Sequence, residues 1–527
     1  NRDFIPVRVD SDRRPDINRR YNQGGWPTVA FLLPSGRPLA GLTYAPPERL
    51  LDVLDRLSAL YRHRREDIEV EAEMAALAER EALRSTRSSG GATGNVADEV
   101  RRFILAAWDR NHGGLGGAPK FPTPEALEFA LYRKVCSGDG EMLRFLTSTL
   151  DGMLKGGLYD PVEGGFFRYA TAPDWSAPHY EKILSDNARL SSLYLAATTV
   201  LDIREYARVA RGTLDYILSS LLDDERRGFY GSQDADEKYY LENGEGRSAR
   251  GAPRVDRTIF VDSSSLAVST LARASAVFGD PELLGISREV SYFLWHECRR
   301  PGLGLCHYYA AEPGRRGLWG QAADQVYYLA SQLDLFQITG DKVFLDRAME
   351  VGDLLVGMYS TDGGWLGEAT TGNHREPAPP DLPYDTPDIA VNGDGARALF
   401  LLEALSPNRG YDESARKIIN SLSGAYRSGA YFSASYALAC EILEKGLVEV
   451  RISPKAKGKA DFLKAASRIF HPRKLSRLET TDDYLEIGLR QDAPDAFVCA
   501  PGICLPVASP EDLPLVIAEV EKTQGKM

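Results

Sequence analysis

Residues 157–189 concentrate side chains that can transfer protons or hold a charged ligand. Counted together with the preceding Gly156, the stretch contains two Gly-Gly pairs and the run Pro178-His179-Tyr180-Glu181, and it has few aliphatic residues before Leu184. A segment of this composition cannot bury itself as a core helix or strand. It therefore predicts a long ordered loop that lies across another part of the molecule.

Carboxyl and imidazole groups are the side chains that most often serve as general acids and bases. The catalytic candidates are His179, Glu181, Asp186, Asp262, His307 and Asp324. Five of the six, the two histidines and the three aspartates, have a structural alternative. The two histidines could hold neighbouring loops by ring hydrogen bonds. The three aspartates begin helical segments, where a carboxylate interacts favourably with the helix dipole.

Twelve segments between residues 95 and 445 have the apolar spacing of amphipathic helices. They cover roughly residues 95–109, 124–135, 141–155, 184–199, 203–220, 262–278, 281–297, 320–338, 342–358, 391–405, 411–424 and 432–445. Connections after even-numbered segments are short, whereas most of those after odd-numbered segments are long and carry glycine beside an aromatic residue. Six antiparallel hairpins of this kind predict an (α/α)6 barrel, hence a mainly α protein, with its long loops and its ligand site at one end.

The first 63 residues predict a partial thioredoxin-like unit. Residues 4–9 alternate like a strand, residues 15–21 form a short helix opened by proline, and a hairpin over 28–43 precedes a helix from Pro46 to about His63. In such a unit the proline before the hairpin, Pro27, is typically cis. The first cysteine is Cys136, so we expect a docking or structural role for this unit. Residues 64–94 predict a charged helix and a linker.

Residues 446–527 predict a small α/β unit. Strands are expected at 448–452, 484–489 and 496–499, and helices at 460–470 and from Pro510 to about Lys522. Cys499 and Cys504 could form a disulfide or half of a metal site, but no second Cys/His pair lies nearby in the sequence. We therefore expect structural thiols there and no metal.

The composition narrows the class of protein. The chain has 527 residues, 43% of them hydrophobic, and a formal charge of -12, which argues against a nucleic-acid partner. It has no run of about 18 apolar residues, so we expect no membrane span. Six cysteines are too few for a disulfide scaffold in a chain of this length, so we expect a cytoplasmic protein.

Several stretches in one order carry a more specific signal. They are VRVDSDRRPDINRRY, GGWPTVAFLLPSGRPL, TYAPPE, GGLGGAPKFPTP, residues 157–189, GFYGSQDADE and FVCAPGICLPVASPEDL. Together they resemble the spermatogenesis-associated protein 20-like family. The resemblance implies a DsbH-like thioredoxin domain joined to a barrel similar to those of six-hairpin glycosidases and N-acylglucosamine 2-epimerases. It also implies a Cys-x-x-Cys segment upstream of the matched region, which this sequence lacks.

A barrel of that class implies a sugar pocket, which needs aromatic faces for the ring and charged groups for the hydroxyls. The substrate-binding candidates are Lys120, Asp160, Arg168, Tyr169, Trp175, Asp234, Asp236 and Trp365. The aromatic residues could equally pack the long loops, and Lys120 is expected to pair with a carboxylate. Inverting hydrolysis would use Glu181 with one of the three aspartates, at a separation of about 6.5–9.5 Å. Epimerisation beside a carbonyl would use an acid and a base on opposite faces, for which His179 and His307 are suited.

The sequence thus favours a carbohydrate-active or carbohydrate-binding protein of the six-hairpin type, with epimerase-like or glycosidase-like chemistry. We expect a small carbohydrate as ligand, no cofactor and no metal. A second hypothesis is a non-catalytic scaffold that binds a protein partner and keeps only a vestigial pocket. A third is thiol redox chemistry, if a preceding segment supplies cysteines.

Overall fold

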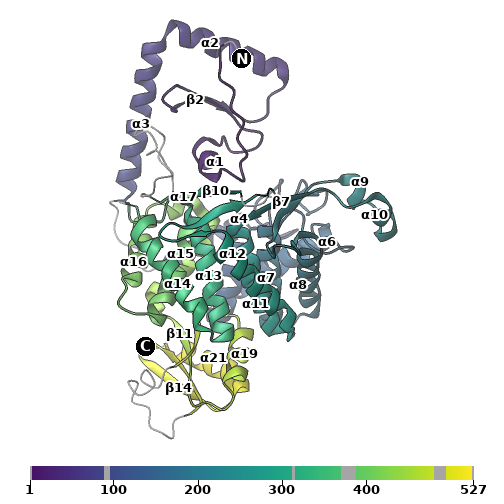
Figure 1. The fold of residues 1–527 in the computed structure, drawn as a ribbon, viewed down its shortest axis with the longest axis vertical. Coiled ribbons are helices and arrows are strands. Elements are labelled where there is room, and N and C mark those ends of the chain that lie inside the picture. Colours follow the sequence, from purple (N-terminus) through teal and green to yellow (C-terminus); the bar gives the residue numbers. More distant parts are fainter. Residues whose placement is uncertain are drawn as a thin grey trace.

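A computed structural model describes residues 3–87, 95–310, 312, 315–361, 363–369, 387–479 and 494–524, and for residues 79–87 it describes the backbone only. Figure 1 shows three units along the long axis, with the N-terminal unit at the top, a helical barrel in the middle and the C-terminal unit at the bottom. No helix in these ranges is both long enough and apolar enough to cross a membrane. The strand expected at 484–489 lies outside the described residues.

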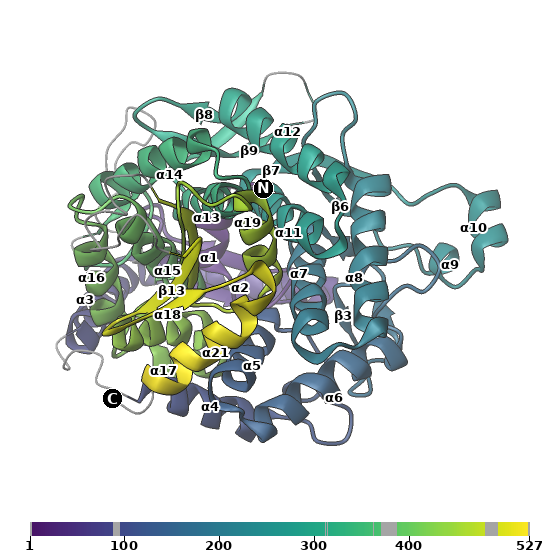
Figure 2. The same cartoon turned by 90° about the horizontal axis from the view of Figure 1, so that it is seen from below.

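Twelve helices alternate between an inner and an outer ring, which confirms the predicted (α/α)6 barrel (Figure 2). The inner helices are α5 Pro124–Ser137, α7 Leu184–Leu201, α11 Val261–Phe278, α13 Ala322–Thr339, α15 Ile389–Leu405 and α18 Ala434–Lys445. The outer helices are α4 Val96–Ala107, α6 Gly140–Gly156, α8 Arg204–Tyr216, α12 Pro281–Glu297, α14 Lys342–Leu354 and α16 Tyr411–Leu422. Each inner helix packs against the next, and α18 closes the ring against α5. Two outer helices end in π-helical turns, η1 Ile217–Leu221 after α8 and η2 Leu355–Tyr359 after α14.

A Gly-Asp pair builds three of the short connections. Gly279 ends α11 with a φ of 70°, a conformation that glycine adopts without strain, and the Asp280 side chain accepts a hydrogen bond from the Glu282 amide at 3.1 Å and so caps α12. Gly138-Asp139 and Gly340-Asp341 repeat the arrangement. Because these links turn the chain within two residues, the long loops gather at the opposite end, where the inner helices begin.

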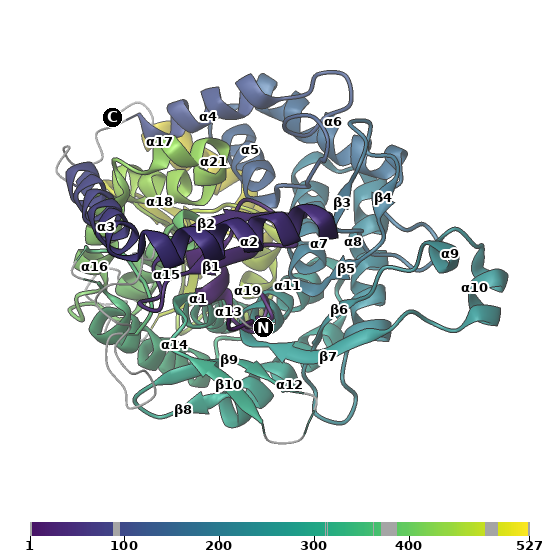
Figure 3. The same ribbon diagram turned by 90° about the horizontal axis from the view of Figure 1, so that it is seen from above.

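The long loops carry most of the β-structure of the barrel. The strands are β3 Tyr169–Ala170, β4 Pro178–His179, β5 Lys182–Ile183, β6 Tyr230–Gln233, β7 Val255–Phe260, β8 Arg299–Arg300, β9 Gly304–Tyr309 and β10 Arg316–Trp319. The order β10-β9-β7-β6-β5, with β8 beside β9, makes one sheet, and β3 pairs with β4. Residues 157–189 form the ordered loop that their composition predicts. Two short helices, α9 Glu237–Tyr240 and α10 Gly244–Arg250, form an arm that projects to one side (Figure 3), while α17 Tyr426–Gly429 and η3 Ala430–Ser433 precede α18.

The N-terminal unit lies across the long-loop end of the barrel, as Figure 3 shows from above. It consists of α1 Pro15–Tyr21, the antiparallel hairpin β1 Val29–Leu32 and β2 Pro38–Leu42, α2 Pro47–His63 and α3 Arg65–Arg87. The Trp26-Pro27 peptide is cis, as predicted. The strand expected at 4–9 is wrong: Ile5 and Val7 are exposed, and no described strand pairs with this segment, without which an extended chain is not a stable sheet element.

The C-terminal unit closes the short-loop end of the barrel. Its elements are β11 Val448–Ile452, α19 Lys459–Arg468, β12 Lys474–Leu478, β13 Ala496–Ala500, β14 Ile503–Val507, η4 Pro510–Asp512 and α21 Leu513–Gln524. The sheet order is β12-β11-β13-β14, and α19 packs against α11 and α13 of the barrel. Cys499 and Cys504 are paired across β13 and β14 in a disulfide, so the expectation of thiols at these two positions is wrong. The other four cysteines are free.

Candidate functional site

The structure brings eight of the predicted residues to the ends where the inner helices begin. Five of them, which we call the Glu181 group, lie on or beside β3, β4, β5 and the start of α7: Arg168, Tyr169, His179, Glu181 and Asp186. Three more, the His307 group, lie on β9 and in the first turns of α11 and α13: Asp262, His307 and Asp324. Their co-location follows from the barrel, because the N-termini of alternate helices meet at one end.

The Glu181 group is held together by an ion pair and a ring stack. The Arg168 guanidinium donates from Nη1 to Glu181 Oε2 at 2.8 Å, and the Arg168 amide donates to the Glu181 carbonyl at 2.8 Å. His179 and Tyr169 face each other across β4 and β3, with their rings stacked 5.0 Å apart. His179 Nε2 lies 3.7 Å from Glu181 Oε2. A carboxylate, a guanidinium and an imidazole thus share one small, partly exposed area.

Asp186 is the least constrained carboxyl group of the site. It sits in the first turn of α7, is partly buried, and its side chain makes no hydrogen bond among the residues that the structure describes. Burial raises the pKa of Asp186 to about 6, and the nearby Glu125 and Glu181 act in the same direction while Arg168 and Arg189 oppose it. A carboxyl group with a pKa close to neutrality can both donate and accept a proton at physiological pH.

His307 is fully engaged on both sides of its ring. Nδ1 lies 3.0 Å from Asp324 Oδ1, and Nε2 lies 2.8 Å from the backbone oxygen of Asp12. Since both neighbours are acceptors, both nitrogens donate and the ring is an imidazolium. Burial opposes this charge, but the Asp324 carboxylate outweighs it and raises the pKa of His307 to about 10. In this arrangement His307 holds the N-terminal unit and has no free nitrogen to accept a proton, and its catalytic role stays a prediction.

The His307 group also has the composition of a metal site, but its geometry does not fit one. The nearest ligand atoms of Asp262, His307 and Asp324 lie within 4.8 Å of one another. Neither ring nitrogen has a free lone pair, however, because each donates to an oxygen. Asp262 accepts hydrogen bonds from the Ser263 amide at 2.6 Å and from the Ser263 hydroxyl at 3.1 Å. We therefore interpret the contacts of Asp262 and Asp324 as structural contacts in the first turns of α11 and α13.

Three substrate-binding candidates are buried away from both groups. Lys120 is fully buried and donates to Asp109 Oδ2 at 2.6 Å and to the Gly113 carbonyl at 2.9 Å, which confirms the expected carboxylate partner. Trp175 is also fully buried, and its indole nitrogen donates to the His112 carbonyl at 3.0 Å. Trp365 is 6% exposed. These buried side chains help to fix the long loops, and their contact with a ligand stays a prediction.

Three further candidates have structural positions as well. Asp160 is completely buried between Lys182 Nζ and Arg247 Nη1, both at 2.7 Å, so it neutralises two buried cations. Asp234 and Asp236 lie at the base of the exposed arm, and Asp236 caps α9 by accepting from the Tyr239 amide at 3.0 Å. The spacing of charged residues in the sequence did not distinguish these loop-building roles from ligand binding.

A segment of the N-terminal unit that was not among the predicted site residues covers the site. Besides the Asp12 contact with His307, Arg13 donates to Thr258 Oγ1 at 2.8 Å and Arg19 donates to Gln321 Oε1 at 2.9 Å. The Arg168 guanidinium lies 5.7 Å from the centre of the Trp26 ring. The signal available in the sequence was the run SDRRPD, whose charges precede a helix that buries little of its own surface.

A cavity of about 260 Å³ lies deeper, along the barrel axis between α7, α11, α13 and α15, and reaches the C-terminal unit. Ion pairs line it or lie at its wall: the partly buried pairs Arg189 with Glu125 at 3.1 Å and Arg397 with Glu128 at 2.9 Å, and the more exposed pair Arg273 with Asp334 at 2.9 Å. The volume is just below the usual range of about 300–1,000 Å³ for ligand sites. Arg189, one turn after Asp186 on α7, connects this cavity to the carboxyl groups above it.

The helices form an (α/α)6 barrel, and this fold is also that of solved sugar epimerases. The barrel is similar to cellobiose 2-epimerase from Spirochaeta thermophila, with a TM-score of 0.51 and 19% identity over 64% of this chain and 84% of that one. It is also similar to a sugar epimerase from a ruminal bacterium, with a TM-score of 0.50 and 13% identity over 65% of this chain and 86% of that one. At these identities the similarity establishes the fold alone.

The sequence comparisons are more specific. Residues 1–79 match the thioredoxin DsbH family, described as "Protein of unknown function, DUF255". The chain is similar to Spermatogenesis-associated protein 20 of Homo sapiens, with 32% identity over 255 residues, which are 44% of this chain and 32% of the human protein. The resemblance read from the motifs is thereby confirmed. The match spans about a third of the length of that curated relative.

Proposed function

We propose that the barrel binds a small carbohydrate at its long-loop end and that Asp186 acts on it as a general acid or base. The observation that carries this proposal is a carboxyl group with no hydrogen-bond partner among the described residues and a pKa raised to about 6 by burial. The charges of Arg168 and Glu181 act on its pKa, and these two side chains together with His179, 3.7 Å from Glu181, can bind hydroxyl groups and share a proton. The epimerase-like fold supports the carbohydrate class of ligand.

The same residues suit two reactions. In an epimerisation, Asp186 would remove a proton from the carbon beside the carbonyl, and His179 would return one on the opposite face. In a hydrolysis, the protonated form of Asp186 would donate to the leaving oxygen, and Glu181 would accept a proton from the attacking water. The two reactions differ in whether a carbon-bound hydrogen exchanges with solvent.

Access to Asp186 requires movement of the N-terminal unit, because Asp12 and Trp26 contact His307 and Arg168 directly. These contacts are few, and Asp12, Arg19 and Trp26 are largely exposed. A ligand hydroxyl that takes the place of the Asp12 carbonyl would give His307 an equivalent acceptor. Binding and uncovering of the site are therefore one event in this proposal.

The test is a thermal-shift panel of mono- and oligosaccharides, cellobiose and mannose among them, followed by NMR in D2O on any sugar that binds. A ligand at 100 times its dissociation constant raises the unfolding free energy by about 2.7 kcal/mol. We expect a shift for the wild type and Asp236→Asn but no turnover by Asp186→Asn. Deuterium at a ring carbon identifies epimerisation, and a cut glycosidic bond identifies hydrolysis. A panel without any shift, or full turnover by Asp186→Asn, contradicts the proposal.

A specific observation also favours the second hypothesis, a non-catalytic scaffold. Arginine–carboxylate pairs occupy the barrel axis, and buried pairs of this kind fix the arrangement of neighbouring helices. In that case the exposed arm formed by α9 and α10 is the surface available to a protein partner. Deletion of residues 237–250 would abolish partner binding while the Asp186→Asn substitution would not. Thiol redox chemistry, the third hypothesis, would require cysteines from outside this sequence.

A further inference from the structure

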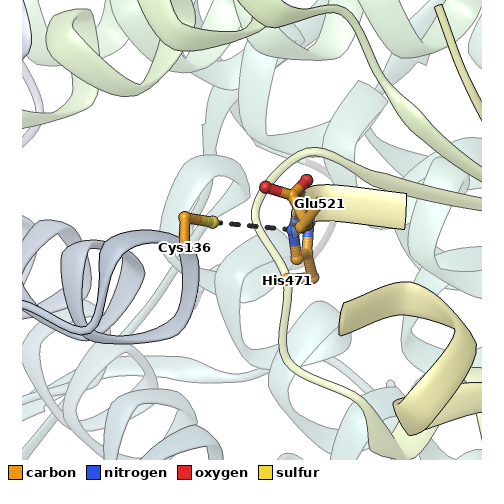
Figure 4. Close-up of side chains that lie close together, drawn as sticks. All are labelled: Cys136, His471 and Glu521. Carbon is orange, nitrogen blue, oxygen red and sulfur yellow. Dashed lines mark hydrogen bonds and ion pairs between the residues drawn. The ribbon is translucent and has the colours of Figure 1, made fainter. Parts of the chain in front are cut away.

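Three side chains from distant parts of the sequence meet where the C-terminal unit contacts the barrel. Cys136 is in the last turn of α5, His471 lies between α19 and β12, and Glu521 is on α21 (Figure 4). His471 Nε2 lies 3.6 Å from Cys136 Sγ and 3.2 Å from Glu521 Oε1. One ligand atom from each residue lies within 4.8 Å of the other two. None of these residues belongs to the site at the other end of the barrel.

Hydrogen bonding alone does not satisfy this arrangement. A single ring nitrogen, His471 Nε2, faces both the thiol and the carboxylate. A neutral imidazole nitrogen either donates one hydrogen or accepts one, so it can pair fully with only one of these two neighbours. The other nitrogen, Nδ1, is buried and has no hydrogen-bond partner in the part of the chain that the structure describes. Burial also disfavours a second proton on the ring and lowers the pKa of His471.

Two of the three distances between the ligand atoms, sulfur to nitrogen and nitrogen to oxygen, match the edges of a tetrahedral zinc site. Bond lengths of about 2.3 Å to sulfur and about 2.0–2.2 Å to nitrogen and oxygen place sulfur and nitrogen about 3.5 Å apart and nitrogen and oxygen about 3.3 Å apart. The observed separations are 3.6 and 3.2 Å. Thiolate, imidazole and carboxylate are all ligands that Zn²⁺ accepts, and a thiolate selects against Mg²⁺ and Ca²⁺.

The charges around the three residues are compatible with a divalent ion. A thiolate and a carboxylate together neutralise Zn²⁺, and the thiol proton leaves to solvent when the ion binds. Arg473, which is buried, also donates to Glu521 Oε1, and it donates to the Gly446 carbonyl at 2.6 Å. A donor on a ligating carboxylate orients that ligand. His471 additionally lines the axial cavity, which offers space for a water molecule as the fourth ligand.

We propose that Cys136, His471 and Glu521 bind a divalent transition-metal ion, with Zn²⁺ as the best fit, and that this ion fastens the C-terminal unit to the barrel. Two of the ligands belong to the C-terminal unit and one to the barrel, so the ion bridges the two. A single ion with these ligands would hold the two units together independently of the apolar contacts between α19 and the inner helices.

The experiment uses the full chain, first treated with a chelator and then titrated with Co²⁺ and Zn²⁺. We expect one ion per chain by mass spectrometry of the metal content, and a thiolate-to-cobalt charge-transfer band in the wild type. Cys440→Ser, which changes a buried cysteine in α18, serves as the matched control and should keep both. Cys136→Ser should lose the band, and Glu521→Gln should weaken binding at least tenfold.

Two results would overturn the proposal. One is a wild-type chain that holds less than a tenth of an equivalent of metal or shows no charge-transfer band. The other is a Cys136→Ser chain that binds cobalt with the same spectrum and stoichiometry as the wild type. If Cys136→Ser does not fold, as judged by circular dichroism, the wild-type band and its displacement by Zn²⁺ decide the matter, because the band reports sulfur coordination directly.

Discussion

The two ends of the barrel are closed in different ways. At the short-loop end the C-terminal unit has an apolar core of its own, with Val448, Phe462 and Leu513 among its buried residues, and it adds partly buried polar contacts to the barrel. Arg468 donates to the Ala276 carbonyl at 2.8 Å, for example. At the long-loop end the N-terminal unit buries few side chains, and it rests on the barrel through hydrogen bonds of partly exposed arginines. The C-terminal unit is therefore part of the folded structure at the short-loop end. The N-terminal unit is a cover over the candidate site.

The largest expected effect tests how the C-terminal unit is held at the short-loop end of the barrel. Arg473→Met removes a buried guanidinium that pairs with Glu521 and with the Gly446 carbonyl, and it leaves the carboxylate without its strongest partner. Loss of one member of a buried ion pair costs about 3–5 kcal/mol. We expect that decrease in the free energy of unfolding by urea titration. Arg204→Met, at the exposed start of α8, is the control and should unfold like the wild type. A decrease in the free energy of unfolding below about 1 kcal/mol would show that the C-terminal unit does not depend on this ion pair for its attachment to the barrel.

The second prediction concerns the junction of the barrel with its cover. Asp324→Asn keeps an acceptor for His307 but removes the charge, at an expected cost of about 2–3 kcal/mol at neutral pH. A histidine with a raised pKa contributes stability that is full below its unfolded value, 6.5, and is lost as the pH rises through about 10. The wild type should therefore lose stability across that interval and the variant should lose less. Parallel pH profiles of the melting temperature would contradict the charged pair.

The third prediction examines the candidate acid or base itself. Because the pKa of Asp186 is raised from 3.8 to about 6, its charged form opposes folding, so wild-type stability should fall as the pH rises from about 4 to about 6. Asp186→Asn removes this dependence and should raise the unfolding free energy at pH 7.5 by at most about 3 kcal/mol. Thermal melts at pH 4.5 and 7.5 measure the difference. A variant that is less stable than the wild type at pH 7.5 would indicate that Asp186 is a structural carboxylate.

The smallest global effect is expected at the cover. Replacing Arg13 and Arg19 together with alanine removes its hydrogen bonds to Thr258 and Gln321, and should lower the unfolding free energy of the barrel by only about 1 kcal/mol. The local effect is larger. Amide hydrogen exchange in residues 10–26 should accelerate at least tenfold, while exchange in α11 and α13 stays unchanged. Unchanged exchange in residues 10–26 would mean that other contacts hold the cover in place.

The sequence predicted the barrel well because its information is local. Apolar spacing located all twelve helices, and the Gly-Asp pairs located their short links. The co-location of Asp186, Asp262 and Asp324 followed from connectivity, since each begins an inner helix. The strand expected at 4–9 failed because alternation alone does not supply a partner strand. Strands β12 and β14 were missed for a related reason, since each is specified by its neighbours in the sheet.

The details of the site depended on long-range contacts and so were less accessible. Lys120, Asp160 and Trp175 have the residue types of a ligand site, but burial against particular loop atoms assigns them to the scaffold. The sequence does not predict that Asp12 contacts His307, which is 295 positions away. It also does not predict that Cys136 contacts His471, which is 335 positions away. Such pairs form only when two units dock, and neither spacing nor composition encodes the docking.

Helices α11 and α13 each have 18 residues and so extend about 27 Å. Their first turns carry Asp262 and Asp324, and they also pack against α19 of the C-terminal unit. The two helices therefore span the barrel and contribute contacts at both of its ends. Any coupling between sugar binding at the long-loop end and metal binding at the C-terminal unit must then be reciprocal. A sugar that changes the metal affinity tenfold is itself bound tenfold more tightly or weakly when the metal is present.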